Sequence, residues 1–90
     1  MIPMILKIDM QKNQKIEGHY IASLKENISI LLEDALFRSN AGRWLDDFQT
    51  PEGIVIFFEM MDYMDGLKII ESTFRHHRYY PLIKVARRVA

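Results

Sequence analysis

Apolar and polar residues alternate near the start of the chain. The alternating apolar positions are Met4, Leu6, Ile8 and Met10. Ile5, Lys7 and Asp9 occupy the positions between them. Because successive side chains of a strand point to opposite faces, this period of two predicts a strand over residues 4–10 with one face on the core.

Residues 15–22 alternate again, with Ile16, Tyr20 and Ala22 on one side, and a polar stretch precedes them. Two structures fit this segment: the second arm of an N-terminal hairpin, or the front of a long helix. We favour the hairpin arm because Ser23 and Glu26 follow with the spacing of a capping box, which marks the start of a helix.

A helix over about residues 24–38 is the clearest local prediction. Its apolar residues recur at helical spacing, namely Leu24, Ile28, Leu31, Leu32, Ala35 and Leu36. The sequence SNAG at residues 39–42 is expected to end this helix, because Asn40 or Gly42 can adopt the left-handed conformation of a helix terminus.

The middle of the chain predicts a central strand. Residues 43–49 have no clear period and fit either a short strand or a loop, and residues 50–53, TPEG, have the composition of a turn. Residues 54–60, IVIFFEM, are β-branched and aromatic with almost no polar interruption. This composition is typical of a central strand that is covered on both faces.

A second helix and a last strand complete the predicted elements. Asp62 can cap the helix, and its apolar residues are Tyr63, Met64, Leu67, Ile70 and Phe74. Pro81 prevents this helix from continuing. Residues 82–89 then alternate as a strand, and charged residues on both of its faces indicate an edge strand.

The order of these elements predicts a single α+β domain over residues 1–90. It fits a two-layer, ferredoxin-like β-α-β-β-α-β sandwich, or a close variant with an extra N-terminal hairpin strand. The apolar and charged fractions, 49% and 27%, are those of an ordinary globular domain. With no cysteine and no apolar run near the roughly 20 residues of a membrane span, we expect a cytoplasmic protein without a membrane partner.

Charge is distributed unevenly along a chain whose net charge is zero. Between Trp44 and Glu71, seven acidic residues face only one cation, Lys68, whereas the chain after Glu71 has five cations and no acid. We therefore predict that an acidic surface binds a partner protein, by fast electrostatic association. The predicted partner-binding residues are Asp46, Asp47, Glu59, Asp62 and Asp65.

The basic segment offers an alternative, because cations contact phosphates and aromatic rings stack on bases. The residues of this alternative nucleic-acid site are Arg75, Arg78, Tyr79, Lys84, Arg87 and Arg88. A dedicated nucleic-acid-binding domain is usually basic overall, and this chain is neutral. We therefore place nucleic-acid binding second.

No pattern in the chain points to catalysis. The adjacent His76 and His77 would point about 100° apart on a helix and cannot chelate one ion together. The four glycines are scattered, so they form no phosphate-binding loop. We predict no catalytic, cofactor-binding or metal-binding residue, and no cofactor.

The sequence thus predicts a small non-catalytic domain that acts by binding another protein. Its size and acidic segment fit an inhibitor or an immunity-type, toxin-neutralising protein or antitoxin, with a basic toxin or nuclease as partner. We also expect a homodimer, because a short chain has a thin stability margin and gains from pairing. The alternative is a nucleic-acid-binding module that uses the basic C-terminal segment.

Overall fold

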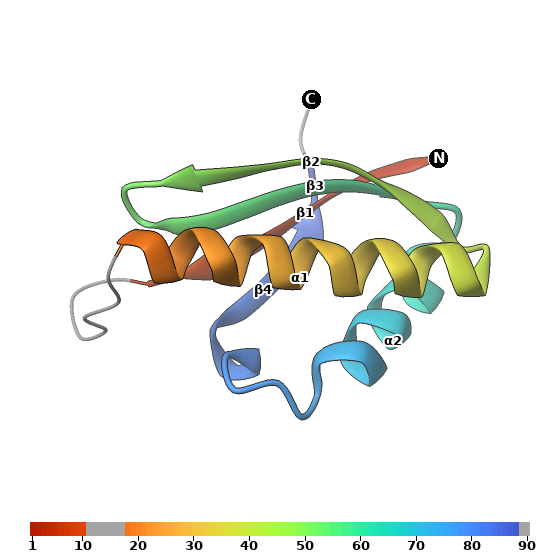
Figure 1. Ribbon diagram of the computed structural model, residues 1–90. Helices are drawn as coiled ribbons and strands as arrows, with labels where there is room; N and C mark the ends of the chain where they lie inside the picture. The colour runs from red at the N-terminus through yellow and green to blue at the C-terminus, as the bar shows by residue number, and fades with distance from the viewer. Residues whose placement is uncertain (11–17, 89–90) are drawn as a thin grey trace.

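The protein is built from one antiparallel sheet and two helices that pack together as two layers (Figure 1). The computed structural model describes residues 1–10 and 18–88. Along the chain, the elements are β1 (Ile2–Asp9), α1 (Gly18–Ser39), β2 (Gly42–Thr50), β3 (Gly53–Met60), α2 (Tyr63–Phe74), a 3₁₀ turn (Tyr80–Leu82) and β4 (Ile83–Arg87). The predicted α+β class with two layers is confirmed.

The four strands lie in the order β2-β3-β1-β4, and every neighbouring pair is antiparallel. Phe58 of β3 lies opposite Met4 of β1, and Ala86 of β4 lies opposite Ile5. The sheet therefore has β1 and β3 at its centre and β2 and β4 at its edges. The central position of residues 54–60 and the edge position of the last strand are both as predicted.

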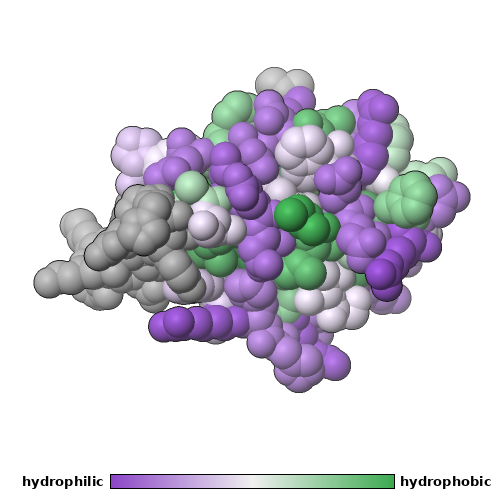
Figure 2. All heavy atoms as spheres, viewed as in Figure 1, coloured by the Kyte–Doolittle hydropathy of each residue, from purple (hydrophilic) through white to green (hydrophobic). Residues whose placement is uncertain are grey.

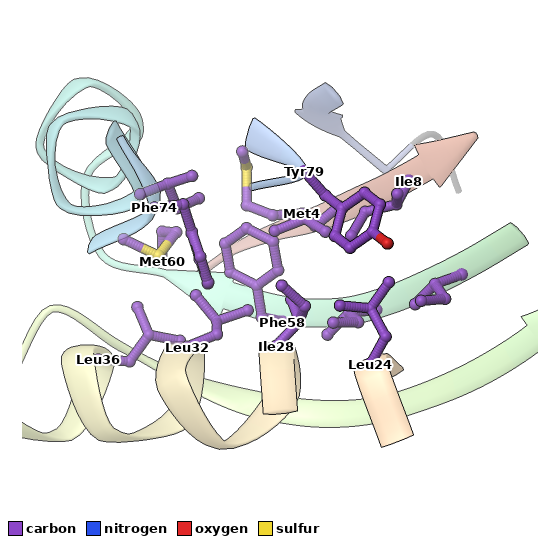
Figure 3. Packing of buried hydrophobic residues seen from close by; sticks show 14 of the residues in the cluster. Met4, Ile8, Leu24, Ile28, Leu32, Leu36, Phe58, Met60, Phe74 and Tyr79 are labelled. Atoms are coloured by element: carbon purple, nitrogen blue, oxygen red, sulfur yellow. The ribbon is translucent and has the colours of Figure 1, made fainter. Parts of the chain in front are cut away.

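The core lies between the sheet and the helices (Figure 3). Phe58 is fully buried, 0% exposed, in the middle of the labelled side chains. The other buried apolar residues come from the two central strands and both helices. They are Met4, Leu6 and Ile8 of β1, Leu24, Ile28, Leu32 and Leu36 of α1, Ile54, Ile56 and Met60 of β3, Ile70 and Phe74 of α2, and Met10 and Tyr79 beside them. Both helices thus cover the same face of the sheet.

The predicted second hairpin arm is wrong over its described part. Residues 18–22 belong to α1, and residues 15–17 lie outside the described residues. Ser23 is therefore not the cap of α1 but an exposed residue inside it. Ile21 packs against the core together with Leu24 and Ile28, so the apolar stripe extends past the capping-box sequence. Packing of Ile21 against the core stabilises this extra turn. It outweighs the capping signal, which would start the helix at Ser23.

The end of α1 is where the sequence predicted it. Asn40 has a positive φ of 52°, and its N–H donates to the carbonyl of Phe37 at 3.2 Å. The N–H of Ala41 donates to the carbonyl of Leu36 at 3.3 Å. These two bonds form a Schellman motif, which satisfies carbonyl groups that the helix itself leaves unpaired. Neither helix in the described ranges is long and apolar enough to cross a membrane.

The ambiguous residues 43–49 form most of β2. A β-bulge interrupts the register between Trp44 and Asp46, where Leu45 has no partner on β3. A bulge inserts one residue and so reverses the alternation that follows it. Trp44 and Asp47 therefore lie on the same face, which explains why these residues showed no clear period.

The TPEG sequence forms the tight turn that was predicted between β2 and β3. Thr50 lies opposite Gly53, so Pro51 and Glu52 are the two loop residues. Gly53 has a φ of 152°, and a Cβ at this position would overlap the carbonyl oxygen of Ile8. Only glycine allows the turn to approach β1 this closely.

The prediction that β3 is covered on both faces is wrong. Ile54, Ile56 and Phe58 are buried under the helices, but Val55 and Phe57 on the opposite face are only partly buried. Both helices lie on one face because α2 follows β3 through a short connection and then packs beside α1. The near-continuous apolar run of β3 thus leaves apolar side chains on the face that neither α1 nor α2 covers.

The start of α2 matches the sequence prediction. The side chain of Asp62 accepts a hydrogen bond from the backbone N–H of Asp65 at 3.0 Å. One turn later, a Cβ on Gly66 would meet the buried side chain of Met60. Because Gly66 has no side chain, α2 can lie close to β3. The packing that this allows offsets the low helix propensity of glycine.

We predict that Phe58→Ala lowers the free energy of unfolding by about 3–5 kcal/mol, because it leaves a cavity where the two layers meet. Urea denaturation followed by circular dichroism measures this loss. Phe37→Ala is the matched control, since Phe37 is 84% exposed and its truncation changes stability by less than about 0.5 kcal/mol. Similar losses in the two variants would contradict this description of the core.

Candidate functional site

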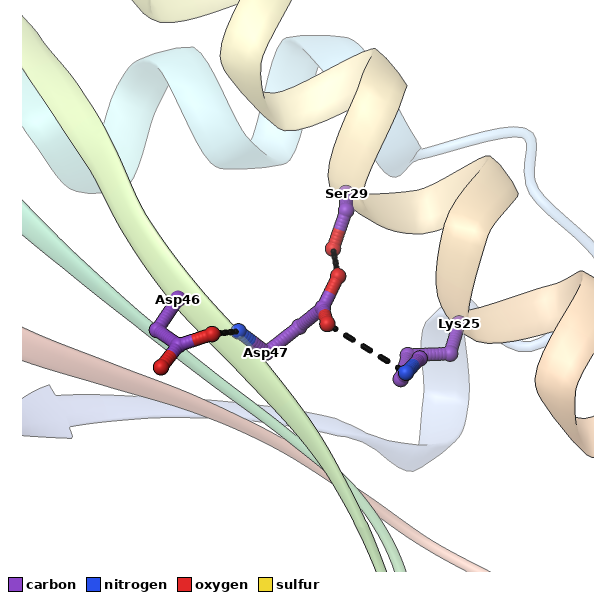
Figure 4. A network of polar contacts seen from close by, with 4 residues as sticks. All are labelled: Lys25, Ser29, Asp46 and Asp47. Atoms are coloured by element: carbon purple, nitrogen blue, oxygen red, sulfur yellow. Dashed lines mark hydrogen bonds and ion pairs between the residues drawn. The ribbon is translucent and has the colours of Figure 1, made fainter.

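The acidic residues that were predicted to form one surface lie on different parts of the molecule. Asp47 points toward the helix layer (Figure 4). Its Oδ2 accepts a hydrogen bond from the Ser29 hydroxyl at 2.7 Å, and its Oδ1 lies 3.3 Å from the Lys25 ammonium group. Ser29 is only 5% exposed. Asp47 therefore joins β2 to α1, and its carboxylate is already engaged within the fold.

The other four predicted acids are placed differently. Asp46 lies on the opposite face of β2 and accepts from the backbone N–H of Asp47 at 2.8 Å. Glu59 forms an ion pair of 3.0 Å with Arg43 on the neighbouring strand. Asp62 and Asp65 are exposed at the start of α2. The structure does not bring the five acids onto one face.

The predicted basic residues are divided in the same way. Arg75 and Arg78 are exposed after α2, whereas Tyr79 is buried in the core. On β4, Arg87 lies opposite Met4 and its guanidinium group is 5.0 Å from the centre of the Tyr63 ring, on the helix side. Only Lys84 and Arg88 remain for the face of the sheet away from the helices.

His77, one of the two adjacent histidines, is engaged within the fold. Nδ1 of His77 accepts a hydrogen bond from the backbone N–H of Tyr79 at 3.2 Å. Nε2 of the same ring lies 3.4 Å from Oδ1 of Asn27. His77 therefore links α1 to the segment after α2. No group of three or more histidine, aspartate or glutamate side chains that could hold a metal occurs among the residues that the structure describes.

The side of the sheet that neither α1 nor α2 covers, here called the open face, brings cations and aromatic rings together. Ile5, Val55 and Phe57 lie along its centre on β1 and β3. Phe48 lies opposite Val55 at the β2 side, and Lys84, Ala86 and Arg88 lie at the β4 side. The sequence alone did not single out Lys7, Phe48 or Phe57, although the alternation around Lys7 did place it away from the core.

Two lysines face each other across the open face. Lys7 of β1 and Lys84 of β4 are directly opposite in the register, and both are exposed. Within the described residues, neither ammonium group has an ion-pair partner. Like charges directly opposite each other destabilise a sheet. An anion bound between them would remove this repulsion.

Aromatic rings lie beside the lysine pair. The rings of Phe48 and Phe57 meet edge to face, with 5.3 Å between their centres, and Phe48 is 42% exposed. The guanidinium group of Arg88 lies 4.7 Å from the centre of the Phe57 ring. An open depression of about 370 Å³ extends along this side of the sheet and is lined by Ile5, Lys7, Lys84 and Arg88, among others.

Comparison with known proteins assigns no family to this arrangement. No protein-family model matches the chain, and searches of curated proteins and of solved structures also gave no match. The chemistry of the open face is therefore the basis for a functional proposal.

We predict that Asp47→Ala lowers the free energy of unfolding by about 1–3 kcal/mol, because it leaves the buried Ser29 hydroxyl without its acceptor. Chemical denaturation measures the change. The neighbouring Asp46→Ala is the control, since Asp46 is exposed on the other face of β2 and its loss changes stability by less than about 0.5 kcal/mol. Equal effects would contradict the structural role of Asp47.

Proposed function

We propose that the open face of the sheet binds single-stranded nucleic acid. The observation that supports this most strongly is the Lys7–Lys84 couple, which has no ion-pair partner within residues 1–10 and 18–88, on the same face as the Phe48–Phe57 ring pair. This function corresponds to the alternative predicted from the sequence, but it uses a different set of residues. Lys84 and Arg88 are retained, and Lys7, Phe48 and Phe57 are added.

The lysine couple fits the phosphate backbone. A phosphate group between Lys7 and Lys84 would turn the repulsion of two ammonium groups into two favourable contacts. Arg88 follows β4 directly and lies on the same face over the Phe57 ring, so a second phosphate can follow along this edge of the sheet. Release of counterions from the nucleic acid on binding makes such contacts favourable at low salt.

The phenylalanine pair fits the bases of a single strand. Every base has a flat π-surface, and stacking on an aromatic side chain contributes roughly 1–3 kcal/mol per base. Phe48 is 42% exposed, and the guanidinium group of Arg88 lies 4.7 Å from the centre of the Phe57 ring, which places a cation beside the stacking surface. A flat sheet reaches bases only where they are unstacked from their neighbours, which favours single strands over a duplex.

Three acidic residues lie on the open face: Asp9 on β1, Asp46 on β2 and Glu59 on β3. Glu59 is paired with Arg43 at 3.0 Å, so its charge is partly compensated. Asp46 is on β2, two strands away from β1 and three from β4. Asp9 lies two residues after Lys7, at the end of β1, so the phosphate path that we propose runs from the lysine couple toward Arg88 and away from Asp9.

We also propose that the domain has the ferredoxin-like arrangement. The strand order β2-β3-β1-β4 with antiparallel neighbours supports this, as do the two helices that lie on one face. Such an arrangement leaves the opposite face of the sheet available for a ligand. The arrangement alone implies no particular ligand, because many functions use one fold.

Binding of a basic protein, such as a toxin or nuclease, stays as a second proposal. The exposed carboxylates of Asp62 and Asp65 at the start of α2, with no partner cation among the described residues, support it. Asp47 has no part in this second proposal because its carboxylate is held by Ser29 and Lys25.

We predict that the double variant Lys7→Ala with Lys84→Ala binds single-stranded oligonucleotides roughly tenfold or more weakly at low salt, because two phosphate contacts are lost. Fluorescence anisotropy with labelled mixed-sequence RNA and DNA, about 12 nucleotides long to match a typical site, measures the affinity. In a plot of log affinity against log salt, the slope should decrease by about 0.7 per lysine.

The control for this prediction is Arg75→Ala with Arg78→Ala, which removes the same charge from the segment after α2. This variant should bind as the original protein does. If it loses as much affinity as the lysine variant, binding depends on overall charge and the open face is not the site. If the original protein binds no oligonucleotide at low salt, the proposed function is wrong.

We predict a different result for Phe48→Ala. This variant should also bind oligonucleotides more weakly, by roughly 1–3 kcal/mol, because a stacking surface is lost. Its salt slope should stay unchanged, since no charge has been removed. An unchanged affinity, measured by the same anisotropy titration, would show that the bases do not stack on this ring.

A further inference from the structure

A second exposed apolar surface lies on α1, on the opposite side of the molecule from the open face. Ile30 is 65% exposed and Phe37 is 84% exposed, although both are large apolar side chains. They are seven residues apart and so lie on the same side of the helix, two turns from each other. Isolated exposed apolar residues are common, but a pair in line on one helix forms a strip.

The strip has a defined border. Ile30, Glu33, Asp34 and Phe37 together line a shallow depression on the outside of α1. In Figure 2, this side of the molecule is mostly hydrophilic, with separate hydrophobic areas between the polar side chains. The apolar strip is thus surrounded by polar surface, as interaction sites are.

The two borders of the strip carry different charges. On one border, Glu26 and Glu33 are exposed and have no ion-pair partner within the described residues. On the other border, Asp34 is paired with Arg38 at 3.0 Å. The uncompensated charge is therefore negative and lies along one side of the strip.

We propose that this strip docks a basic amphipathic helix of another protein. An amphipathic helix presents apolar side chains at positions such as i, i+4 and i+7, which fits the two-turn spacing between Ile30 and Phe37. Lysine or arginine residues beside those apolar anchors would face Glu26 and Glu33. Charge complementarity thus determines both the sign of the partner's charge and the orientation of the partner on α1.

A second copy of this chain fits the strip less well. If two α1 helices packed antiparallel about a two-fold axis, the border with Glu26 and Glu33 would lie against the same border of the other copy. Four carboxylates would then face one another, and like charges brought together at an interface are unfavourable. This repulsion favours a basic partner over self-association.

A synthetic peptide of leucine, alanine and lysine tests the proposal. It is about 18 residues long, or five helical turns, with leucine along one face and lysine beside it. We expect saturable binding to the whole protein, and shifts of backbone amide signals in residues 26–38 in NMR titrations. A peptide of the same composition in scrambled order should bind roughly tenfold more weakly, because it has no continuous apolar face.

Two variants separate this inference from the open face. Phe37→Ala should weaken peptide binding roughly tenfold, since it removes the most exposed anchor, and should leave oligonucleotide binding unchanged. Phe48→Ala should weaken oligonucleotide binding and leave peptide binding unchanged. Each proposal therefore fails or holds without the other.

Three outcomes would overturn the inference. Equal affinity for the ordered and scrambled peptides would mean that charge alone attracts the peptide. An unchanged affinity in Phe37→Ala would mean that the peptide binds elsewhere. A concentration-dependent dimer in sedimentation experiments that Phe37→Ala abolishes would assign the strip to a second copy of the chain.

Discussion

Burial of only one face of the sheet is the constraint on which the other features depend. Both helices pack on the face that contains Met4, Phe58 and Met60, and these side chains form the core with the stripes of α1 and α2. A sheet face that lacks such a cover must be stable in contact with water or with a ligand. The open face meets this requirement through charged side chains of both signs around a small aromatic centre.

The β-bulge at Leu45 shows how one local irregularity changes the placement of charge. Without it, strict alternation would put Asp47 on the same face as Leu45 and Trp44 on the other. With it, Trp44 packs at the core and Asp47 reaches Ser29 and Lys25 on α1. A cluster of charges along the sequence is therefore a poor guide to a charged surface, because the fold sends adjacent carboxylates to opposite sides.

Much of the fold could be read from the sequence because periodicity reports burial. The strand around Leu6, the helix around Ile28 and the end of α1 at Asn40 follow directly from spacing and turn chemistry. The start of α1 could not be read in this way, since the Ser23 capping signal competes with the burial of Ile21, which depends on the rest of the fold. The candidate site was harder to predict from the sequence than the fold. Lys7 and Lys84 are 77 positions apart in the sequence, and only the register of β1 with β4 brings them together.

The lysine couple is the place where a local rule and the global fold disagree. Directly opposed like charges destabilise a sheet, and an edge strand needs only scattered charge to discourage unwanted pairing. Lys84 alone would protect the β4 edge, so that purpose does not explain Lys7 beside it. Natural sequences tend to break such rules at functional sites. The anionic ligand that we propose for the open face would account for both lysines together, whereas protection of the edge accounts for one.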